Sequence, residues 1–311
     1  MASRKARAAA WCLLIVLALV STLDARIVAV ATSNLSNAAF DRSHDSTPWQ
    51  FGIPARNVTI PSDGVALAGW WMPGLAGSPN ATATVVLVHG YSTQMGKAVR
   101  HWAPNLHAAG YSLLAIDLRN HGASGNTTPP FVTYGVDESR DVLAAVAWVR
   151  AHASGLGVSS DRIGLYGESM GAVSVLLAAA THPAGVRAVV ADSAYASFRY
   201  EASLDGAKQG YPPAVIAWVV SDMDQMAPSP PTQADAAAAI ADVDVPVLVA
   251  HCTDDARLPD SSFDLILANV GTATVWHQPC PRGDSKDHHA DGWANAGYNA
   301  TVDAFLASAL R

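Results

Sequence analysis

A serine between two glycines, in the run Gly167-Glu168-Ser169-Met170-Gly171, is the first feature of this sequence that could do chemistry. A serine hydroxyl attacks a carbonyl carbon only when a neighbouring base removes its proton, so a reactive serine must be held out towards partners from elsewhere in the chain. A tight turn does this, and it needs glycines because a Cβ at either position would collide with a neighbouring strand or helix. The motif therefore predicts a serine nucleophile for acyl transfer.

The residues on both sides of this motif favour the catalytic interpretation over an ordinary Gly/Ser turn that enters a core helix. Residues 162–166 form a short apolar run of strand type, and Ala172 to Ala180 are rich in Ala, Leu and Val and of helical type. A strand, a serine between glycines and a helix together form a nucleophile elbow. The first amides of the helix, among them that of Met170, point at charge that develops beside the serine.

The second oxyanion donor is expected from the loop that follows a buried strand at Thr84 to His89. The amide of Tyr91 is the predicted donor, and Gly90 allows that backbone to approach the nucleophile closely. Tyr91 and Met170 are therefore the two residues whose amides we expect to hold an oxyanion.

The orienting carboxylate is expected after a later strand, since the partners of such a serine follow it in the order acid and then histidine. Asp254 and Asp255 come directly after a predicted strand at residues 246–250. Asp255 sits one turn beyond the strand, where a carboxylate can reach an imidazole, so it is the predicted acid. Asp254 remains the alternative, as a neighbour that caps the loop.

The base is expected between the last predicted strand, Ala273 to Trp276, and the C-terminal helix. His288 and His289 lie there, and either could reach the serine. His277, at the end of the strand itself, is predicted to be structural. A metal site of Cys280, His288, His289 and Asp291 matches no zinc spacing, so neither a metal nor a cofactor is predicted.

Strand and helix patterns alternate along most of the chain, which requires crossover connections and a parallel sheet. A turn at residues 61–64 joins two further strand runs, 57–60 and 65–72, into a hairpin. The rhythm breaks at about 194–244, where aromatic residues and prolines replace clear strands. The fold class is therefore α/β, with a mostly parallel central sheet flanked by helices and a helical cap insertion at 194–244.

The composition is that of a globular protein: half of the 311 residues are hydrophobic and 14% are charged. The net charge is −7, and no block of Lys and Arg occurs after residue 7, so no nucleic-acid partner is expected. The sequence does not indicate an oligomeric state.

The N-terminus has the pattern of an export signal. Arg4, Lys5 and Arg7 precede a charge-free apolar run at residues 8–20, which is short for a full membrane span. Residues 29–31 form an A-x-A cleavage pattern, but charged residues separate it from the apolar run. Two interpretations follow for residues 1–31: a cleaved signal peptide, or an uncleaved anchor with membrane association through residues 8–23. Residues 32–56 are predicted to be a linker, and either interpretation places the protein outside the cytosol.

The cysteines agree with export. Cys12 lies in the apolar run, which leaves Cys252 and Cys280 just past two neighbouring predicted strands, at the same edge of the sheet. We expect a disulfide between these two residues, as is common in oxidising compartments.

Taken together, these motifs resemble the α/β-hydrolase superfamily over about residues 57–310, and most of all the membrane-anchored or secreted bacterial serine hydrolases of the YqkD/Bem46-like type. The resemblance rests on the elbow and on further motifs. These are residues 62–73 (SDGVALAGWWMP), 89–91 (HGY), 117–124 (DLRNHGAS), 191–195 (ADSAY) and 251–259 (HCTDDARLP).

The resemblance implies a role for individual residues. By likeness, Ser169 is the nucleophile, Asp255 the acid and His289 the base. Because His288 precedes His289 directly, His288 remains the alternative base. Cys252 replaces the glycine usual in the acid motif. The implied activity is hydrolysis of a small-molecule carboxylic ester or thioester through an acyl-enzyme. The alternatives are a serine peptidase of the prolyl-oligopeptidase type, disfavoured because no propeller-sized N-terminal segment precedes the domain, and a non-catalytic binding protein on the same fold.

Overall fold

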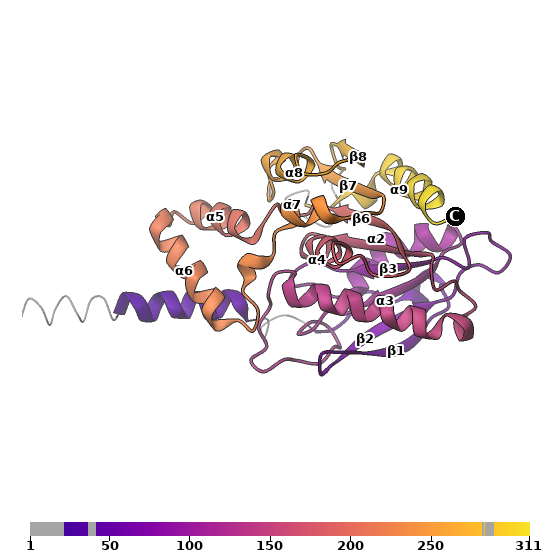
Figure 1. Cartoon of the computed structure of the whole chain (residues 1–311), viewed down its shortest axis with the longest axis horizontal. Helices are drawn as coiled ribbons and strands as arrows, with labels where there is room; N and C mark the ends of the chain where they lie inside the picture. The colour runs from indigo at the N-terminus through magenta and orange to yellow at the C-terminus, as the bar shows by residue number, and fades with distance from the viewer. Residues whose placement is uncertain (1–21, 37–41, 282, 284–288) are drawn as a thin grey trace, which may run out of the picture.

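The computed structural model describes residues 22–36, 42–281, 283 and 289–311. Its centre is an eight-stranded sheet in the order β1-β2-β4-β3-β5-β6-β7-β8, with helices on both faces (Figure 1). Strands β3 to β8 pair in parallel, whereas β1 and β2 form an antiparallel hairpin that joins the sheet through β4. The predicted mostly parallel sheet with an N-terminal hairpin is confirmed.

The strands occupy the apolar runs of the sequence. They are β1 (Arg56–Ser62), β2 (Val65–Met72), β3 (Thr84–Val88), β4 (Ser112–Ile116), β5 (Ile163–Glu168), β6 (Val186–Asp192), β7 (Val247–Cys252) and β8 (Ala273–Gln278).

The helices fill the crossovers between them. The longer ones are α2 (Met95–Ala108), α3 (Val136–Leu156), α4 (Met170–Ala179), α5 (Phe198–Lys208), α6 (Pro213–Met226), α8 (Asp260–Leu267) and α9 (Ala296–Ala309), and α7 is the short turn Ala236–Ala239.

Alternate residues of the central strands belong to two separate cores. In β3, Val86 and Val88 pack on the side of α3 and α4, whereas Val85 and Leu87 pack on the side of α2 and α9. All four side chains are fully buried. A strand covered on both faces has no solvent side, which explains why its sequence is a continuous apolar run and not an alternating one.

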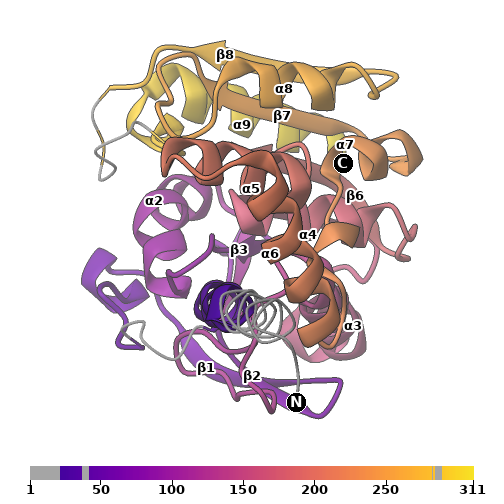
Figure 2. The ribbon, with the colours of Figure 1, turned by 90° about the vertical axis from the view of Figure 1, so that its left-hand side faces the viewer.

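The predicted cap insertion leaves the sheet after β6 and returns at β7. Its base is closed by an antiparallel bridge between Ser197 and Asp235, and its body is the helical pair α5 and α6. Figures 1 and 2 show this pair standing beyond the carboxyl ends of the strands, on the same side as the N-terminal helix.

Residues 22–35 form a helix that packs on the domain through Ile27, Ala31 and Leu35, all of them buried. The segment 8–23, for which membrane association was predicted, lies almost wholly outside the described residues. No helix within the described part of the chain is both long and apolar enough to cross a membrane.

The stretch predicted as a linker is attached to the domain. It includes the end of the N-terminal helix and a 3-10 helix at Pro48–Phe51. His44 Nε2 lies 2.7 Å from Asp117 Oδ2, and Arg42 donates to the carbonyl oxygens of Gly122 and Ser124. Two polar residues of this stretch, Arg42 and His44, are thus partners of the loop after β4.

Candidate active site

Ser169 occupies a strained turn between β5 and α4. Its backbone angles are φ 51° and ψ −119°, a region that costs free energy for a residue with a Cβ, and its amide donates to Asp192 O at 2.8 Å. A Cβ on Gly171 would lie 2.5 Å from His89 O, and one on Gly167 would lie 2.2 Å from Gly171 O. Both glycines are therefore sterically required, as the sequence predicted.

The loop after β3 lies directly against this turn. A Cβ on Gly90 would be 3.3 Å from Ser169 Cβ. The buried ring of His89 holds the loop in place, because Nδ1 bonds to Gly90 O at 2.8 Å and Nε2 accepts from the Leu118 amide at 3.1 Å. Burial lowers the pKa of His89, which suits a neutral ring that donates through one nitrogen and accepts through the other. Tyr91 follows immediately, so its amide belongs to the backbone nearest the serine.

Asp255 and His289 meet beyond the ends of β7 and β8. His289 Nδ1 lies 2.8 Å from Asp255 Oδ2, and the Asp255 side chain is fully buried. Burial by itself would raise the pKa of Asp255, but the hydrogen bond and charge of His289 and the Leu258 amide hold this pKa below its usual value. Asp255 is therefore an ionised carboxylate that orients one nitrogen of the ring, with Nε2 on the ring's other side.

The alternatives left open by the sequence differ in position. Asp254 Oδ1 accepts from the Cys280 amide at 2.9 Å. It therefore caps the loop that the disulfide Cys252–Cys280 closes, and that predicted disulfide is present. His277 Nε2 lies 3.0 Å from Asp260. His288 lies outside the described residues.

Comparisons with known proteins agree with this architecture. A family model for the alpha/beta hydrolase fold matches residues 83–218. The uncharacterized protein YqkD of Bacillus subtilis (strain 168) is 31% identical over 132 residues, a match that covers 42% of this chain and 41% of that protein. The match thus spans about two fifths of the length of this relative.

Solved structures match over most of the chain. An esterase from Pyrococcus furiosus superposes with a TM-score of 0.68 at 20% identity, over 89% of this chain and 99% of that one. A bacterial membrane phospholipase A superposes with a TM-score of 0.59 at 16% identity, over 97% of this chain and 99% of that one.

The chain has the α/β-hydrolase fold. In this fold the reactive serine stands at the elbow after the central strand, with the acid and the histidine on loops after later strands. Ser169, Asp255 and His289 have this placement. The described residues contain no group of three or more His, Cys, Asp or Glu side chains that could hold a metal ion.

The elbow of this fold rests on a buried ion pair. Glu168, next to the serine, is 3.0 Å from Lys97 Nζ and 3.7 Å from His101 Nδ1. Burial would raise the pKa of Glu168, but the Lys97 ammonium and the His101 ring hold this pKa well below its usual range. The charged carboxylate therefore ties the elbow to helix α2.

A second buried carboxylate, Asp192, lies at the end of β6 and supports the elbow through its backbone carbonyl. Its side chain accepts from Tyr298 Oη at 2.8 Å and from Ser193 Oγ at 2.9 Å. Burial raises the pKa of Asp192 to about 6, with Glu168 acting in the same direction and His289 in the opposite one. Its place at the end of a buried strand is visible in the sequence, but the shift of its pKa is not.

The Asp192 carboxyl should make the protein lose stability as pH rises from about 4 to about 6. Because its pKa is higher in the folded chain, folding favours the protonated form. That contribution is complete below about pH 4 and is lost as pH passes about 6. We expect Asp192→Asn to abolish this loss. Urea denaturation measures the free energy of unfolding of both proteins. Between about pH 4 and about pH 7, the variant should gain on the order of 2–3 kcal/mol of stability relative to wild type. A difference that is constant with pH would contradict the assignment.

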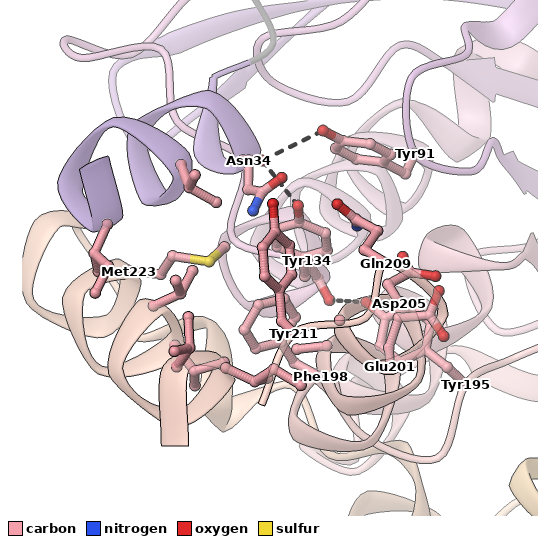
Figure 3. Close-up of a pocket in the computed structure, with 18 of the residues that line it drawn as sticks. Asn34, Tyr91, Tyr134, Tyr195, Phe198, Glu201, Asp205, Gln209, Tyr211 and Met223 are labelled. Atoms are coloured by element: carbon pink, nitrogen blue, oxygen red, sulfur yellow. Dashed lines mark hydrogen bonds between the residues drawn. The ribbon is translucent and has the colours of Figure 1, made fainter. Parts of the chain in front are cut away.

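A pocket of about 850 Å³ opens beside Ser169 (Figure 3). Its walls come from the loop after β3, the cap helices α5 and α6, the acid loop at Arg257 and the helix of residues 22–35. The volume is within the range of pockets that bind small organic ligands, and most of the lining is apolar.

The N-terminal helix is joined to the site by its last turn. Tyr134 Oη donates to Asn34 O at 2.8 Å, Tyr91 Oη donates to the same oxygen at 3.3 Å, and the two rings stack. The Val132 amide donates to Leu35 O at 2.7 Å. The sequence predicted export for this segment but not its place in the pocket wall. The apolar residues Ile27, Ala31 and Leu35, spaced by four, were the sequence signal for a helix that packs on the domain.

Proposed function

We propose that this protein is a serine hydrolase that cleaves carboxylic esters through Ser169, Asp255 and His289. The observation that carries the proposal is the 2.8 Å contact between a buried, ionised Asp255 and His289, on the strand ends that also present the strained Ser169. The apolar pocket beside the serine supports an acyl substrate over a highly charged one.

The reaction would follow the chemistry of an activated serine. His289 Nε2 takes the proton of Ser169 Oγ while Oγ bonds to the carbonyl carbon, and the negative charge on the carbonyl oxygen is stabilised by the amides of Tyr91 and Met170. The imidazolium, stabilised by Asp255, then gives its proton to the departing alcohol as the C–O bond breaks. Water attacks the acyl-enzyme in the same way, losing a proton to His289, and the proton returns to Ser169 as the acid leaves. Thioesters fit the same steps, with a thiol as leaving group.

Labelling by a fluorophosphonate tests the proposal, because only an activated serine reacts with this probe. Intact mass should show one adduct on the wild type and none on Ser169→Ala. Ser174→Ala, one turn along α4, where Ser174 Oγ bonds Met170 O, is the matched control and should be labelled like the wild type. Steady-state turnover of p-nitrophenyl butyrate should follow the same order. A folded wild type that gives no adduct would instead favour a binding protein on a hydrolase fold.

We also propose that the protein is exported and keeps its N-terminal helix. The A-x-A pattern at residues 29–31 lies within that helix, and Ala31 is fully buried. Cleavage after Ala31 would remove one wall of the pocket and leave the Asn34 carbonyl on a severed end. The disulfide Cys252–Cys280 is consistent with folding in an oxidising compartment.

Deletion of residues 1–31 is therefore expected to lower kcat/KM for p-nitrophenyl esters by roughly tenfold to a hundredfold, because the Asn34 carbonyl that Tyr91 contacts is left on a severed end and no longer anchors the Tyr91 loop. The matched control is deletion of residues 1–21, which leaves the described helix in place and should keep kcat/KM within about twofold of wild type. Intact mass of the protein recovered after export should show that residues 22–31 are retained. A fully active product that begins at residue 32 would contradict this proposal.

A further inference from the structure

We propose that the apolar side of the pocket, between α6 and the helix of residues 22–35, is a binding site for the long acyl chain of an ester. This inference rests on the proposed function, and it adds the class of substrate. It is carried by two facing helical stripes that line one continuous space leading away from Ser169.

The first stripe belongs to α6. Five apolar residues of α6 line the pocket: Val215, Ile216, Val219, Val220 and Met223. They recur at intervals of three and four residues, which places them on one helical face. Only Val220 and Met223 are fully buried by protein atoms. The other apolar side chains of this face point into the open pocket. A ligand that removes them from water would bind favourably.

The second stripe belongs to the N-terminal helix. Leu23, Ile27, Val30 and Asn34 line the same pocket at intervals of three and four residues, again on one helical face. Asn34 lies at the inner end, where it meets Tyr91 and Tyr134 (Figure 3). Leu23, about three turns earlier in the helix, is 45% exposed. The eleven steps from Leu23 to Asn34 rise about 16 Å along the helix, so the wall is long enough for an extended acyl chain and far longer than an acetyl group needs.

The opposite side of the pocket is polar, which gives the substrate a direction. Figure 3 shows Glu201 and Asp205 of α5, with Gln209 just after this helix, together on the side away from Met223. Arg257 pairs with Glu201 at 2.7 Å and lies 3.7 Å from Asp205. Burying a hydrocarbon chain against these charges would cost their hydration, so the acyl chain is directed to the α6 side.

Two apolar side chains of the N-terminal helix stay partly exposed where they line the pocket, and Arg26 of the same helix lines it beside them. Leu23 and Val30 are 45% and 37% exposed, although both contribute to the pocket wall. A chain that extends past the end of the cavity would still meet hydrocarbon there. The acyl chain could belong to an ester in a membrane or to a soluble lipid ester, and both sources present the same chemistry to this site.

The test compares kcat/KM for p-nitrophenyl laurate and p-nitrophenyl acetate in the full-length protein. Wild type should prefer laurate. Val219→Trp places a large ring in the acyl space and should lower the laurate-to-acetate ratio by about tenfold or more, because laurate needs the space that the ring fills and acetate does not. Ala217→Trp is the matched control, since Ala217 is exposed on the same helix and does not line the pocket; its ratio should not change.

A second pair of variants covers the other wall and guards against a folding defect in the first. Ile27→Asn puts an amide into the pocket wall and should also lower the laurate-to-acetate ratio, whereas Val28→Asn, on the exposed side of the helix, should not. Fluorophosphonate labelling of Ser169 reports whether each variant has an intact site.

The outcomes separate the two proposals. A labelled wild type that prefers acetate, or labelled Val219→Trp and Ile27→Asn variants with unchanged ratios, would overturn the acyl site and leave the hydrolase intact. A wild type with neither an adduct nor ester turnover would overturn the proposed function and the acyl site with it. Release of fatty acid from vesicles of dioleoyl phosphatidylcholine would support the site with a membrane source, and turnover of monomeric p-nitrophenyl laurate alone would support it with a soluble source.

Discussion

If the proposed function holds, replacement of His289 by alanine is expected to lower kcat for ester hydrolysis by roughly a millionfold, as does loss of the nucleophile or base in a serine protease. The reason is that the Ser169 hydroxyl has no other group to take its proton when the ring is removed. Steady-state turnover of p-nitrophenyl butyrate measures the effect, with active-site titration to exclude traces of wild-type enzyme.

The neighbouring histidine supplies the control. His288→Ala changes the same residue type one position earlier, so it shows whether the loss belongs to the ring that meets Asp255. We expect its kcat to stay within a few-fold of wild type. If His288→Ala abolished turnover and His289→Ala preserved it, the base would be the other histidine, and the 2.8 Å contact would be structural only.

Asp255→Asn is expected to lower kcat by about ten-thousandfold, which is the size of effect seen when an orienting aspartate becomes an amide. The charge that stabilises the imidazolium is lost, and an amide can hold the ring in the wrong tautomer. The shape of the side chain is almost unchanged, so the fold should persist. The pH profile of kcat/KM and the thermal unfolding curve, measured together, distinguish a catalytic loss from a folding defect.

Asp254→Asn is the matched control for this prediction. Asp254 contacts the Cys280 amide, and an asparagine Oδ1 can accept the same hydrogen bond, so we expect near-normal turnover. Equal losses in the two variants would mean that the acid loop matters as a whole and that Asp255 has no special role.

The sheet could be predicted from the sequence because each strand is recognisable locally. A run such as Thr84–Val88 must be buried on both faces, and few structures other than a central parallel strand accommodate such a run. The elbow was predictable for the same reason: the collisions that require Gly167 and Gly171 involve neighbours that the sequence already placed, a strand before the turn and a helix after it.

The choice between adjacent residues could not be made from spacing alone. Asp254 and Asp255 follow the same strand, and a difference of one position in a loop turns a side chain to another side. In the structure Asp254 accepts from the Cys280 amide, whereas Asp255 contacts His289. The amides of Arg257 and Leu258 also bind the Asp255 carboxylate and hold it in this direction.

The N-terminal segment shows most clearly which contacts cannot be predicted from a local sequence pattern. A basic leader followed by an apolar run reads as an export signal, and nothing in residues 22–35 names a distant partner. Their place in the pocket wall depends on contacts with Tyr91, Tyr134 and Val132. Tyr91 is 57 residues and Tyr134 100 residues from Asn34 along the chain, so these contacts form only when the sheet has formed.

The sequence by itself thus determined the parallel sheet, the elbow at Ser169, the order of the candidate acid and base, and the disulfide pair, since each depends on local patterns or on strand ends that meet at one edge. Only the tertiary structure decided which aspartate faces His289, that burial raises the pKa of Asp192 to about 6, and that the helix of residues 22–35 closes the pocket. These properties arise from contacts and desolvation between distant segments, which no local pattern encodes.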